Sequence, residues 1–162
     1  MLIRAARPDD LPAISALQRE AIVTLAEASY GAAATTAWAR WQAADALTLL
    51  DNGGAFLVGE GPSGLIAVGG WRPDARSPSV AWVRAVFVSP DRARHGAGRR
   101  LMAKVEDSAS AAGRKDLRLI ASVNARLFYE ALRYTVSASH QWEIEPGLVL
   151  PCLLMEKLLP ER

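Results

Sequence analysis

The sequence has little of several features that would mark other classes of protein. Cys152 is the only cysteine, so no disulfide can form within the chain, and a reducing compartment is expected. No apolar run reaches the length that spans a bilayer, and the residues after Met1 lack the hydrophobic core of a signal peptide. We therefore expect a cytoplasmic protein that does not associate with a membrane.

Several common functional motifs are also missing. His95, His140 and Cys152 show none of the spacings typical of metal ligands, so no metal is expected. Neither a G-x-S-x-G elbow nor a G-x-x-x-x-G-K-[ST] phosphate loop occurs. The segment 96–101 falls short of a dinucleotide fingerprint, because Leu101 stands where a third small residue is needed for close packing.

What is present indicates one globular domain over residues 1–162, with 51% hydrophobic and 22% charged residues. The net charge of +2 is too small to indicate a nucleic-acid partner. Basic residues nevertheless outnumber Asp74 and Asp91 between positions 72 and 104, where we expect them to surround an anion site. These basic residues are Arg72, Arg76, Arg84, Arg92, Arg94, Arg99, Arg100 and Lys104.

The stretch 83–100 predicts a phosphate site. An apolar run over 83–88 ends at Ser89-Pro90, and a basic loop then leads through Gly96-Ala97-Gly98 into an amphipathic helix. The first N–H groups of a helix lack intrahelical partners and carry the positive end of its dipole. Glycines allow a ligand to approach the backbone closely, so the pattern favours a polyphosphate. A solvated strand-to-helix turn without a ligand is the alternative.

Periodicity and turn residues predict strands and helices in alternation. The first helix starts around Pro8 and is broken at Ser29-Tyr30-Gly31; the second has Thr35 or Thr36 as its N-cap and ends at Asn52-Gly53-Gly54. Strands are expected at 2–6, 55–59, 65–71, 80–88, 117–122, 136–144 and 148–157. The two later helices are expected at 98–112 and 124–132.

The segment Phe87-Val88-Ser89-Pro90 followed by Gly96-Ala97-Gly98 resembles the acyl-coenzyme A motif of the GCN5-related N-acetyltransferase (GNAT) family, although Ala93 replaces its usual Gln or Arg. The resemblance implies a single-domain α/β (α+β) acyl-CoA N-acyltransferase fold: a mixed, mostly antiparallel seven-stranded sheet flanked by about four helices. It implies acetyl-CoA as co-substrate, with Phe87 and Val88 pairing with pantetheine between two splayed strands. The pyrophosphate would be held by Arg94, His95, Gly96, Ala97, Gly98 and Arg99.

A second motif, Asn124 to Tyr134, resembles the family's N-A-x-x-F-Y-E-x-L-G-F/Y segment, with Arg133 in place of the glycine. The resemblance implies that Tyr129 is the general acid on the departing coenzyme A thiolate. Thiols of this kind have a pKa near 8.5 and phenols near 10, so a phenol can stabilise or protonate the sulfur. Residues 127, 128, 131 and 132 are expected to form the buried face, with Tyr129 off its centre. Asn124 is either a cofactor contact or an N-cap.

The expected acceptor is an amine, on a small molecule or a protein, and family members often form homodimers. The resemblance implies that Tyr30, Trp38 and Trp41 belong to one wall of the acceptor site, with core packing as the alternative for each of them. Trp82 is a further candidate by hypothesis: its side chain could point into the acceptor cleft and favour an apolar or aromatic substrate. Trp82 occupies the position of the glutamate that many members use to assist deprotonation. A water chain, Glu27, Asp74 or His140 could replace it, or no base is needed.

The leading hypothesis is thus direct acetyl transfer from acetyl-CoA to an amine. An acyl-CoA-binding sensor or regulatory domain is the first alternative, which the absent strand carboxylate favours. A polyanion-binding module using the basic loop is the second, although the chain lacks a broad basic stripe with interleaved aromatic residues.

Overall fold

The computed structural model describes residues 1–44, 46–51 and 53–160. Within this part of the chain, seven strands form one sheet in the order β1-β2-β3-β4-β5-β7-β6. The strands are β1 (Leu2–Ala5), β2 (Ala55–Gly61), β3 (Gly64–Pro73), β4 (Val80–Val88), β5 (Asp116–Ser122), β6 (Thr135–Glu145) and β7 (Leu148–Leu158). The α-helices are α1 (Leu11–Leu25), α2 (Glu27–Tyr30), α3 (Ala32–Ala44), α4 (Ala97–Ala111) and α5 (Arg126–Ala131). Short 3-10 turns are η1 (Pro8–Asp10), η2 (Ala46–Leu49), η3 (Pro90–Arg92) and η4 (Val123–Ala125).

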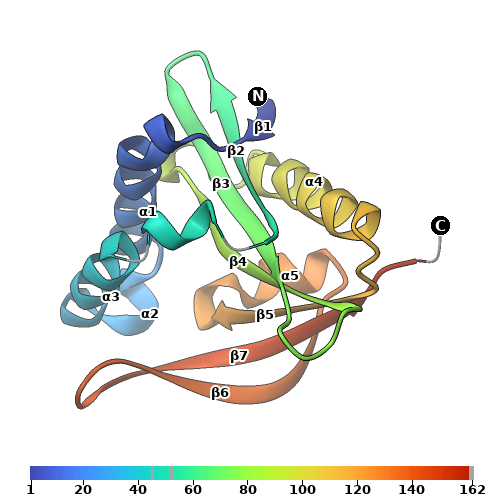
Figure 1. The fold of residues 1–162 in the computed structure, drawn as a ribbon. Coiled ribbons are helices and arrows are strands. Elements are labelled where there is room, and N and C mark those ends of the chain that lie inside the picture. Colours follow the sequence, from blue (N-terminus) through green and yellow to red (C-terminus); the bar gives the residue numbers. More distant parts are fainter. Residues whose placement is uncertain (45, 52, 161–162) are drawn as a thin grey trace.

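The described sheet is mixed, since β4 and β5 pair in parallel and its other neighbouring strands pair antiparallel. Helices α1, α2 and α3 lie on one side of the strands and α4 on the other (Figure 1). This arrangement confirms the predicted fold class. The described residues contain one α-helix more than expected, because the short helix α2 lies where the sequence predicted the break around Ser29-Tyr30-Gly31.

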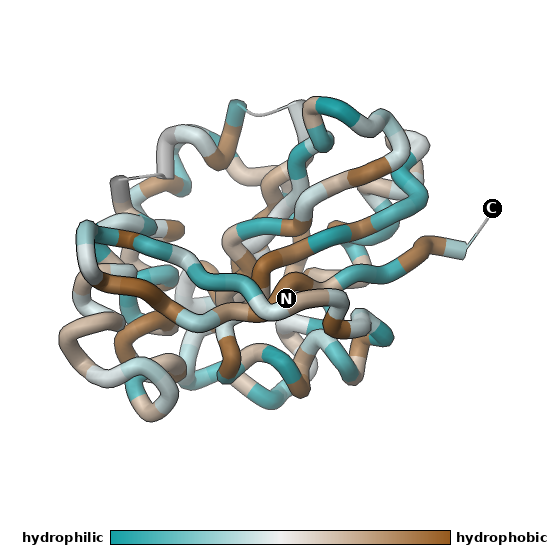
Figure 2. Tube along the Cα trace, turned by 90° about the horizontal axis from the view of Figure 1, so that it is seen from below, coloured by the Kyte–Doolittle hydropathy of each residue, from teal (hydrophilic) through white to brown (hydrophobic). Residues whose placement is uncertain are grey.

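The core lies on both faces of the sheet. Leu101, Met102 and Val105 of α4 pack with Leu117 and Leu119 of β5 on one face, all of them fully buried. Two smaller apolar clusters lie under α1 and α3 on the other face. Figure 2 shows hydrophobic and hydrophilic residues following one another along the chain, as expected for strands and helices that each bury one face.

The second predicted helix begins earlier than expected. Gly31, in a left-handed conformation with φ of 84°, separates α2 from α3, so the helix starts at Ala32. Thr35 is therefore not an N-cap; its hydroxyl donates to the carbonyls of Gly31 and Ala32, as threonine commonly does inside a helix. The predicted end at Asn52 falls outside the described residues.

Candidate active site

Strands β4 and β5 diverge and open a cavity between them. Their pairing covers only Val80, Ala81 and Trp82 on β4, so the rest of this edge of β4 has no strand beside it. A cavity of about 1180 Å³ runs along that edge, bounded by α1, α3, the start of α4, α5, β6 and β7. Because strand N–H and C=O groups are hydrogen-bonding groups that need partners, the edge at Phe87 and Val88 can accept an extended ligand as an extra strand.

One end of the cavity is an anion-binding loop. Arg94 and Gly96 both adopt left-handed conformations, with φ of 64° and 81°, and curl the chain tightly into α4. The N–H groups of Ala97, Gly98 and Arg99 occupy the first turn of α4, where no intrahelical carbonyl is available. Since this helix end also carries the positive dipole, the loop is suited to phosphate oxygens.

Most of the predicted cofactor residues line this cavity. They are Phe87, Val88, Arg94, Gly96, Gly98, Arg99 and Asn124. Two others do not: the His95 side chain is exposed, with Nδ1 2.7 Å from the Ala93 carbonyl, and Ala97 is buried in the core. For Ala97 only its backbone N–H can therefore contribute to the loop.

Gly98 permits close packing at the loop. A Cβ at this position would lie 3.0 Å from Phe128 and 3.2 Å from Val88, so a larger residue would push α4 away from α5 and β4. Gly98 thus has a packing role in addition to the predicted contact with a ligand.

A bulge in β4 is a feature that the sequence did not predict. Val68 pairs with Phe87 and Gly70 with Arg84, so Ala85 and Val86 face only Gly69 on the neighbouring strand. Ala85 has a φ of 51°, rare for a residue with a side chain. The signal was the glycine pair in β3, because a Cβ on Gly69 would lie 2.9 Å from Val86.

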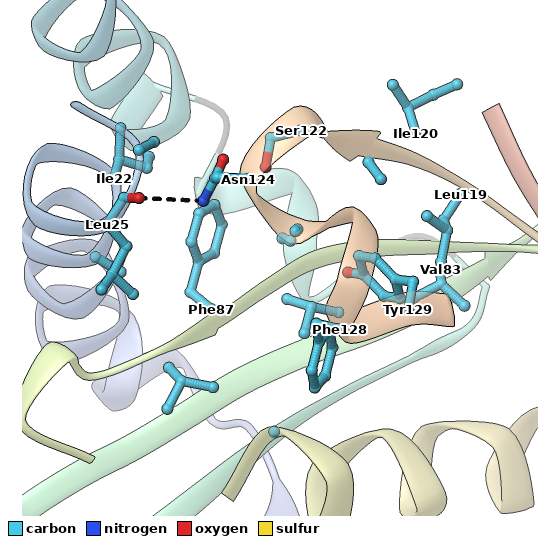
Figure 3. A pocket seen from close by; sticks show the side chains of 18 of the residues that line it. Ile22, Leu25, Val83, Phe87, Leu119, Ile120, Ser122, Asn124, Phe128 and Tyr129 are labelled. Carbon is cyan, nitrogen blue, oxygen red and sulfur yellow. Dashed lines mark hydrogen bonds between the residues drawn. The ribbon is translucent and has the colours of Figure 1, made fainter. Parts of the chain in front are cut away.

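Tyr129 is buried, contrary to expectation. Its side chain is 7% exposed, whereas Leu127, predicted to be in the core, is 77% exposed. Helix α5 follows the 3-10 turn η4 directly, and this junction sets which residues of α5 face the core. Tyr129 faces inward and packs against Phe128 and Tyr134. Burial raises the pKa of its phenol above the usual value, so it is protonated at neutral pH. Figure 3 shows the Tyr129 hydroxyl directed toward the interior of the cavity.

Asn124 joins two sides of the cavity. Its Nδ2 donates to the Leu25 carbonyl at the end of α1 over 3.3 Å, as Figure 3 shows. The N-cap positions of η4 and α5 are Ser122 and Ala125, so Asn124 is not the predicted cap. Its amide instead links α1 to the segment that carries Tyr129.

The opposite end of the cavity is aromatic. Trp38 lies 6.1 Å from Tyr30, 6.2 Å from Phe87 and 6.0 Å from Trp142, between ring centroids. Trp41 contacts Trp142 at 4.6 Å, and all five rings line the cavity. Sequence reasoning missed Trp142, because β6 lies far along the chain from the helices that it meets here.

Tyr30 and Trp82 each have a structural partner. The Tyr30 hydroxyl donates to the Pro151 carbonyl at 2.7 Å and accepts from the Val123 N–H at 2.9 Å, while burial raises its pKa to about 12. Tyr30 therefore holds β7 against the start of η4. The Trp82 indole N–H donates to Asp74 at 2.8 Å, which fixes its ring at the cavity wall.

Basic residues lie at both ends of the cavity, and the sequence did not show which of them belong to which end. Arg94 and Arg99 flank the phosphate loop, but Arg72 and Arg84 lie at the aromatic end, away from that loop. The expectation that all the basic residues over 72–104 surround one anion site is therefore wrong. The two groups of arginines are close in the sequence but are separated in the fold, because β4 extends from one end of the cavity to the other.

No Asp or Glu of the described residues lines the cavity. Of the three residues considered as a base, Glu27 and Asp74 lie outside the lining and His140 lies within it. The Trp82 indole and the N–H groups of Arg76 and Ser77 donate to Asp74 and lower its pKa, making it a weaker base.

Residues 1–44, 46–51 and 53–160 contain no group of His, Cys, Asp and Glu side chains that could hold a metal ion. Their helices include none long and apolar enough to cross a membrane.

Comparison with known proteins identifies the class that this fold and cavity define. The acetyltransferase (GNAT) family model matches residues 16–134. The chain belongs to this family, which confirms the resemblance seen in the two motifs. No curated protein matches the chain significantly.

Solved structures share the fold over nearly the whole chain. A GCN5-related N-acetyltransferase from Rhodopseudomonas palustris has a TM-score of 0.83 at 23% identity, covering 98% of this chain and 95% of that one. The protein yncA of Salmonella typhimurium, solved with its cofactor acetyl-CoA, has a TM-score of 0.67 at 25% identity, covering 100% and 95%. The paiA N-acetyltransferase of Thermoplasma acidophilum, solved with coenzyme A, has a TM-score of 0.74 at 19% identity, covering 98% of each chain.

Proposed function

We propose that this protein is an N-acetyltransferase that moves an acetyl group from acetyl-CoA to an amine by direct transfer in a ternary complex. The observation that carries the proposal is the layout of one cavity. An anion-binding helix start lies at one end, an unpaired strand edge runs along it, and a protonated phenol lines it.

The phosphate loop and the edge of β4 would hold acetyl-CoA. The N–H groups from Arg94 to Arg99 face the pyrophosphate, with the guanidinium groups of these two residues adding charge. The backbone of Phe87 and Val88 pairs with the pantetheine amides. Relatives with this fold that were solved with acetyl-CoA or coenzyme A support this assignment.

The transfer takes place near the bulge. The neutral amine forms a bond to the thioester carbon, the carbon–sulfur bond breaks, and the sulfur leaves as a thiolate. The nitrogen, positively charged after the attack, releases one proton to water and becomes the neutral amide. Backbone N–H groups of the bulge at Ala85 and Val86, where the ladder with β3 is interrupted, are suited to stabilise the carbonyl oxygen as it gains charge. Tyr129 donates its proton or a hydrogen bond to the leaving sulfur. The ammonium proton goes beforehand to water or to His140.

A second candidate function is an acyl-CoA-binding sensor without turnover. One observation favours it: no described carboxylate lines the cavity to assist deprotonation of the amine. For an alkylamine with a pKa near 10.4, losing the proton at pH 7 costs roughly 4–5 kcal/mol. Release of free coenzyme A thiol in the presence of a panel of amines would identify the enzyme; binding without release would identify the sensor.

Thermal melting with and without acetyl-CoA tests the cofactor assignment. At about 100 times its dissociation constant, the ligand should stabilise the protein by roughly 2.7 kcal/mol and raise the melting temperature by several degrees. Gly96→Glu should abolish this rise, because a carboxylate would face the phosphate site. Gly147→Glu is the matched control, since both glycines have a φ of 81° and open space at the Cβ position. No rise in the folded native protein would refute the proposal.

A further inference from the structure

Gln42 of α3 places a carboxamide in the wall of the aromatic end of the cavity. The residue is only 5% exposed, lines the cavity, and makes no hydrogen bond with the residues that the structure describes. A buried amide without partners is costly, and the large majority of buried polar side chains in native proteins are hydrogen-bonded. Because Gln42 borders the cavity, a bound ligand can supply the missing partners.

A second buried glutamine shows what distinguishes Gln42. Gln18 of α1 is 1% exposed, and neither its Oε1 nor its Nε2 has a partner among the described residues. Gln18 does not line the cavity, however, so a ligand bound there does not meet it. The two side chains share their chemistry and their burial, and they differ in access to the cavity.

The spacing along α3 places Gln42 beside two tryptophans. Trp38 and Gln42 are four residues apart on the same face of the helix, and all of Trp38, Trp41 and Gln42 line the cavity. The Trp38 ring lies 6.2 Å from that of Phe87, between centroids, and Phe87 directly follows the bulge in β4. Gln42 is about one helical turn, roughly 5–6 Å, further along α3. A small molecule can therefore bind Gln42 with one group and present another to the bulge.

The carboxamide of Gln42 is suited to a group with an adjacent donor and acceptor. Its Oε1 accepts hydrogen bonds and its Nε2 donates them. A primary amide has a carbonyl oxygen and an N–H on the same side, so it can pair with Gln42 through two parallel hydrogen bonds. An ether or ketone leaves Oε1 without a donor, and a carboxylate places a second acceptor against it. A primary amide is thus the group that pairs with both ends of the Gln42 side chain.

An amide next to the acceptor amine also makes its proton easier to remove. An α-amino group beside an amide has a pKa of about 7.7–8.0, whereas an alkylamine has one of about 10.4. At pH 7 roughly one in ten molecules of the first kind is neutral, against roughly one in 2,500 of the second. Because neither Glu27 nor Asp74 lines the cavity to assist, the site suits an amine that loses its proton readily.

We propose that the acceptor is an α-amino amide with an apolar side chain, and that Gln42 determines this specificity. The amide pairs with the Gln42 carboxamide, and the apolar side chain packs on Trp38, Trp41 and Trp142. The α-amine forms the bond to the thioester carbon, the carbon–sulfur bond breaks, and the nitrogen releases one proton to water. This inference rests on the proposed acetyltransferase function for its turnover, whereas the pairing with Gln42 can be tested by binding alone.

The test compares five matched acceptors at saturating acetyl-CoA: L-phenylalaninamide, its N-methylamide, L-phenylalaninol, L-phenylalanine and phenethylamine. The kcat/KM is expressed per unprotonated amine, so that differences in basicity do not enter the comparison. We expect L-phenylalaninamide to exceed phenethylamine about 5- to 100-fold, the range for two neutral hydrogen bonds. Equal values for these two, or a higher value for any of the other three, would overturn the proposal. A faster N-methylamide would indicate a peptide N-terminus as the acceptor instead.

Variants assign the preference to Gln42. Gln42→Met keeps the length of the side chain and removes its hydrogen bonds, so it should lower the kcat/KM of L-phenylalaninamide to about that of phenethylamine. Gln18→Met is the matched control, because it removes the other buried amide without partners, away from the cavity. It should leave the preference for the amide intact. A preference that survives Gln42→Met contradicts the assignment.

If no acceptor is turned over, calorimetry on the coenzyme A complex separates the two proposals. Tighter binding of L-phenylalaninamide than of phenethylamine, lost in Gln42→Met and kept in Gln18→Met, supports the role of Gln42 and refutes only the enzyme. Equal binding of the two compounds, or binding of neither, refutes the role of Gln42.

Discussion

Tyr129 lies where the core around α4 and α5 meets the cavity. Its ring packs 5.0 Å from Phe128 and 5.7 Å from Tyr134, measured between centroids, so the protein holds the phenol in one place. Burial raises its pKa, which keeps the proton on the oxygen at neutral pH. A fixed, protonated hydroxyl in an otherwise apolar wall is suited to meet a departing thiolate.

Replacing Tyr129 by Phe should lower kcat for acetyl transfer about 100-fold or more, the usual contribution of a general acid, with little change in the KM for acetyl-CoA. The melting temperature should change little, because the ring remains. Steady-state kinetics and thermal melting on the same preparations measure both quantities.

Tyr134→Phe is the matched control at the residue scale. Its hydroxyl donates to Glu106 at 3.1 Å and does not line the cavity. Its loss should cost about 1 kcal/mol of stability and leave kcat unchanged. Equal kcat for the native protein and Tyr129→Phe would rule out the general-acid role.

At the scale of elements, the bulge and splay of β4 create the site. Pairing with β5 stops after Trp82, and Ala85 and Val86 together face the single residue Gly69 on β3. Gly69 makes this possible because it has no side chain beneath Val86. A strand of regular geometry would close the edge and leave no backbone groups for a ligand.

Gly69→Ala should therefore disturb the bulge. Its Cβ would lie 2.9 Å from Val86 Cγ2, 3.1 Å from Val86 Cα and 3.2 Å from Leu101, so neighbouring atoms must move. We expect a loss of about 1–3 kcal/mol in stability, measured by urea denaturation. Combining it with Val86→Ala should recover part of this loss. Strictly additive effects in the double mutant would exclude the contact as the cause.

At the scale of the whole molecule, Arg4 of β1 joins three elements. Its guanidinium donates to Asp10 in η1 at 2.7 and 2.9 Å and to Glu60 of β2 at 3.0 Å. The hydrogen bonds from Arg4 lower the pKa of Asp10 to about 2. This network fixes the start of α1 against the first edge of the sheet.

The network predicts an acid dependence of stability. The pKa of Asp10 is lower in the folded state than its ordinary value of 3.8, so the unfolded state binds more protons in this range. The stabilisation is present above about pH 4 and is lost as the pH falls toward 2. Asp10→Asn should lower the melting temperature near pH 6, and its difference from the native protein should shrink on acidification.

The neighbouring Asp9→Asn variant serves as the control, because Asp9 forms no ion pair with the described residues. A constant difference in melting temperature between the native protein and Asp10→Asn from pH 6 to pH 2.5 would contradict the role of the Arg4 network.

The cytoplasmic location and a homodimer, both suggested by the sequence, stay predictions.

Sequence reasoning succeeded where a function depends on local backbone. The phosphate loop was predictable because Gly96, Gly98 and the helix start are adjacent in the chain, and left-handed turns and free N–H groups are local properties. The succession of strands and helices along the chain followed from periodicity and turn residues, and the family followed from two motifs. The orientation of Tyr129 did not, because a short 3-10 turn before α5 rotates the helix by an amount that spacing does not encode.

The sequence by itself determined the fold class, the loop that suits phosphate and the presence of a tyrosine in the second motif. Tertiary structure alone decided which side chains share the cavity: Trp142 with Trp38, Arg72 with Arg84, and Asn124 with the end of α1. The physical reason is that local conformation depends on neighbours in the chain. The walls of this cavity come instead from segments that lie far apart in the sequence, from Ala21 to Cys152. Only the order and register of the strands bring these segments together.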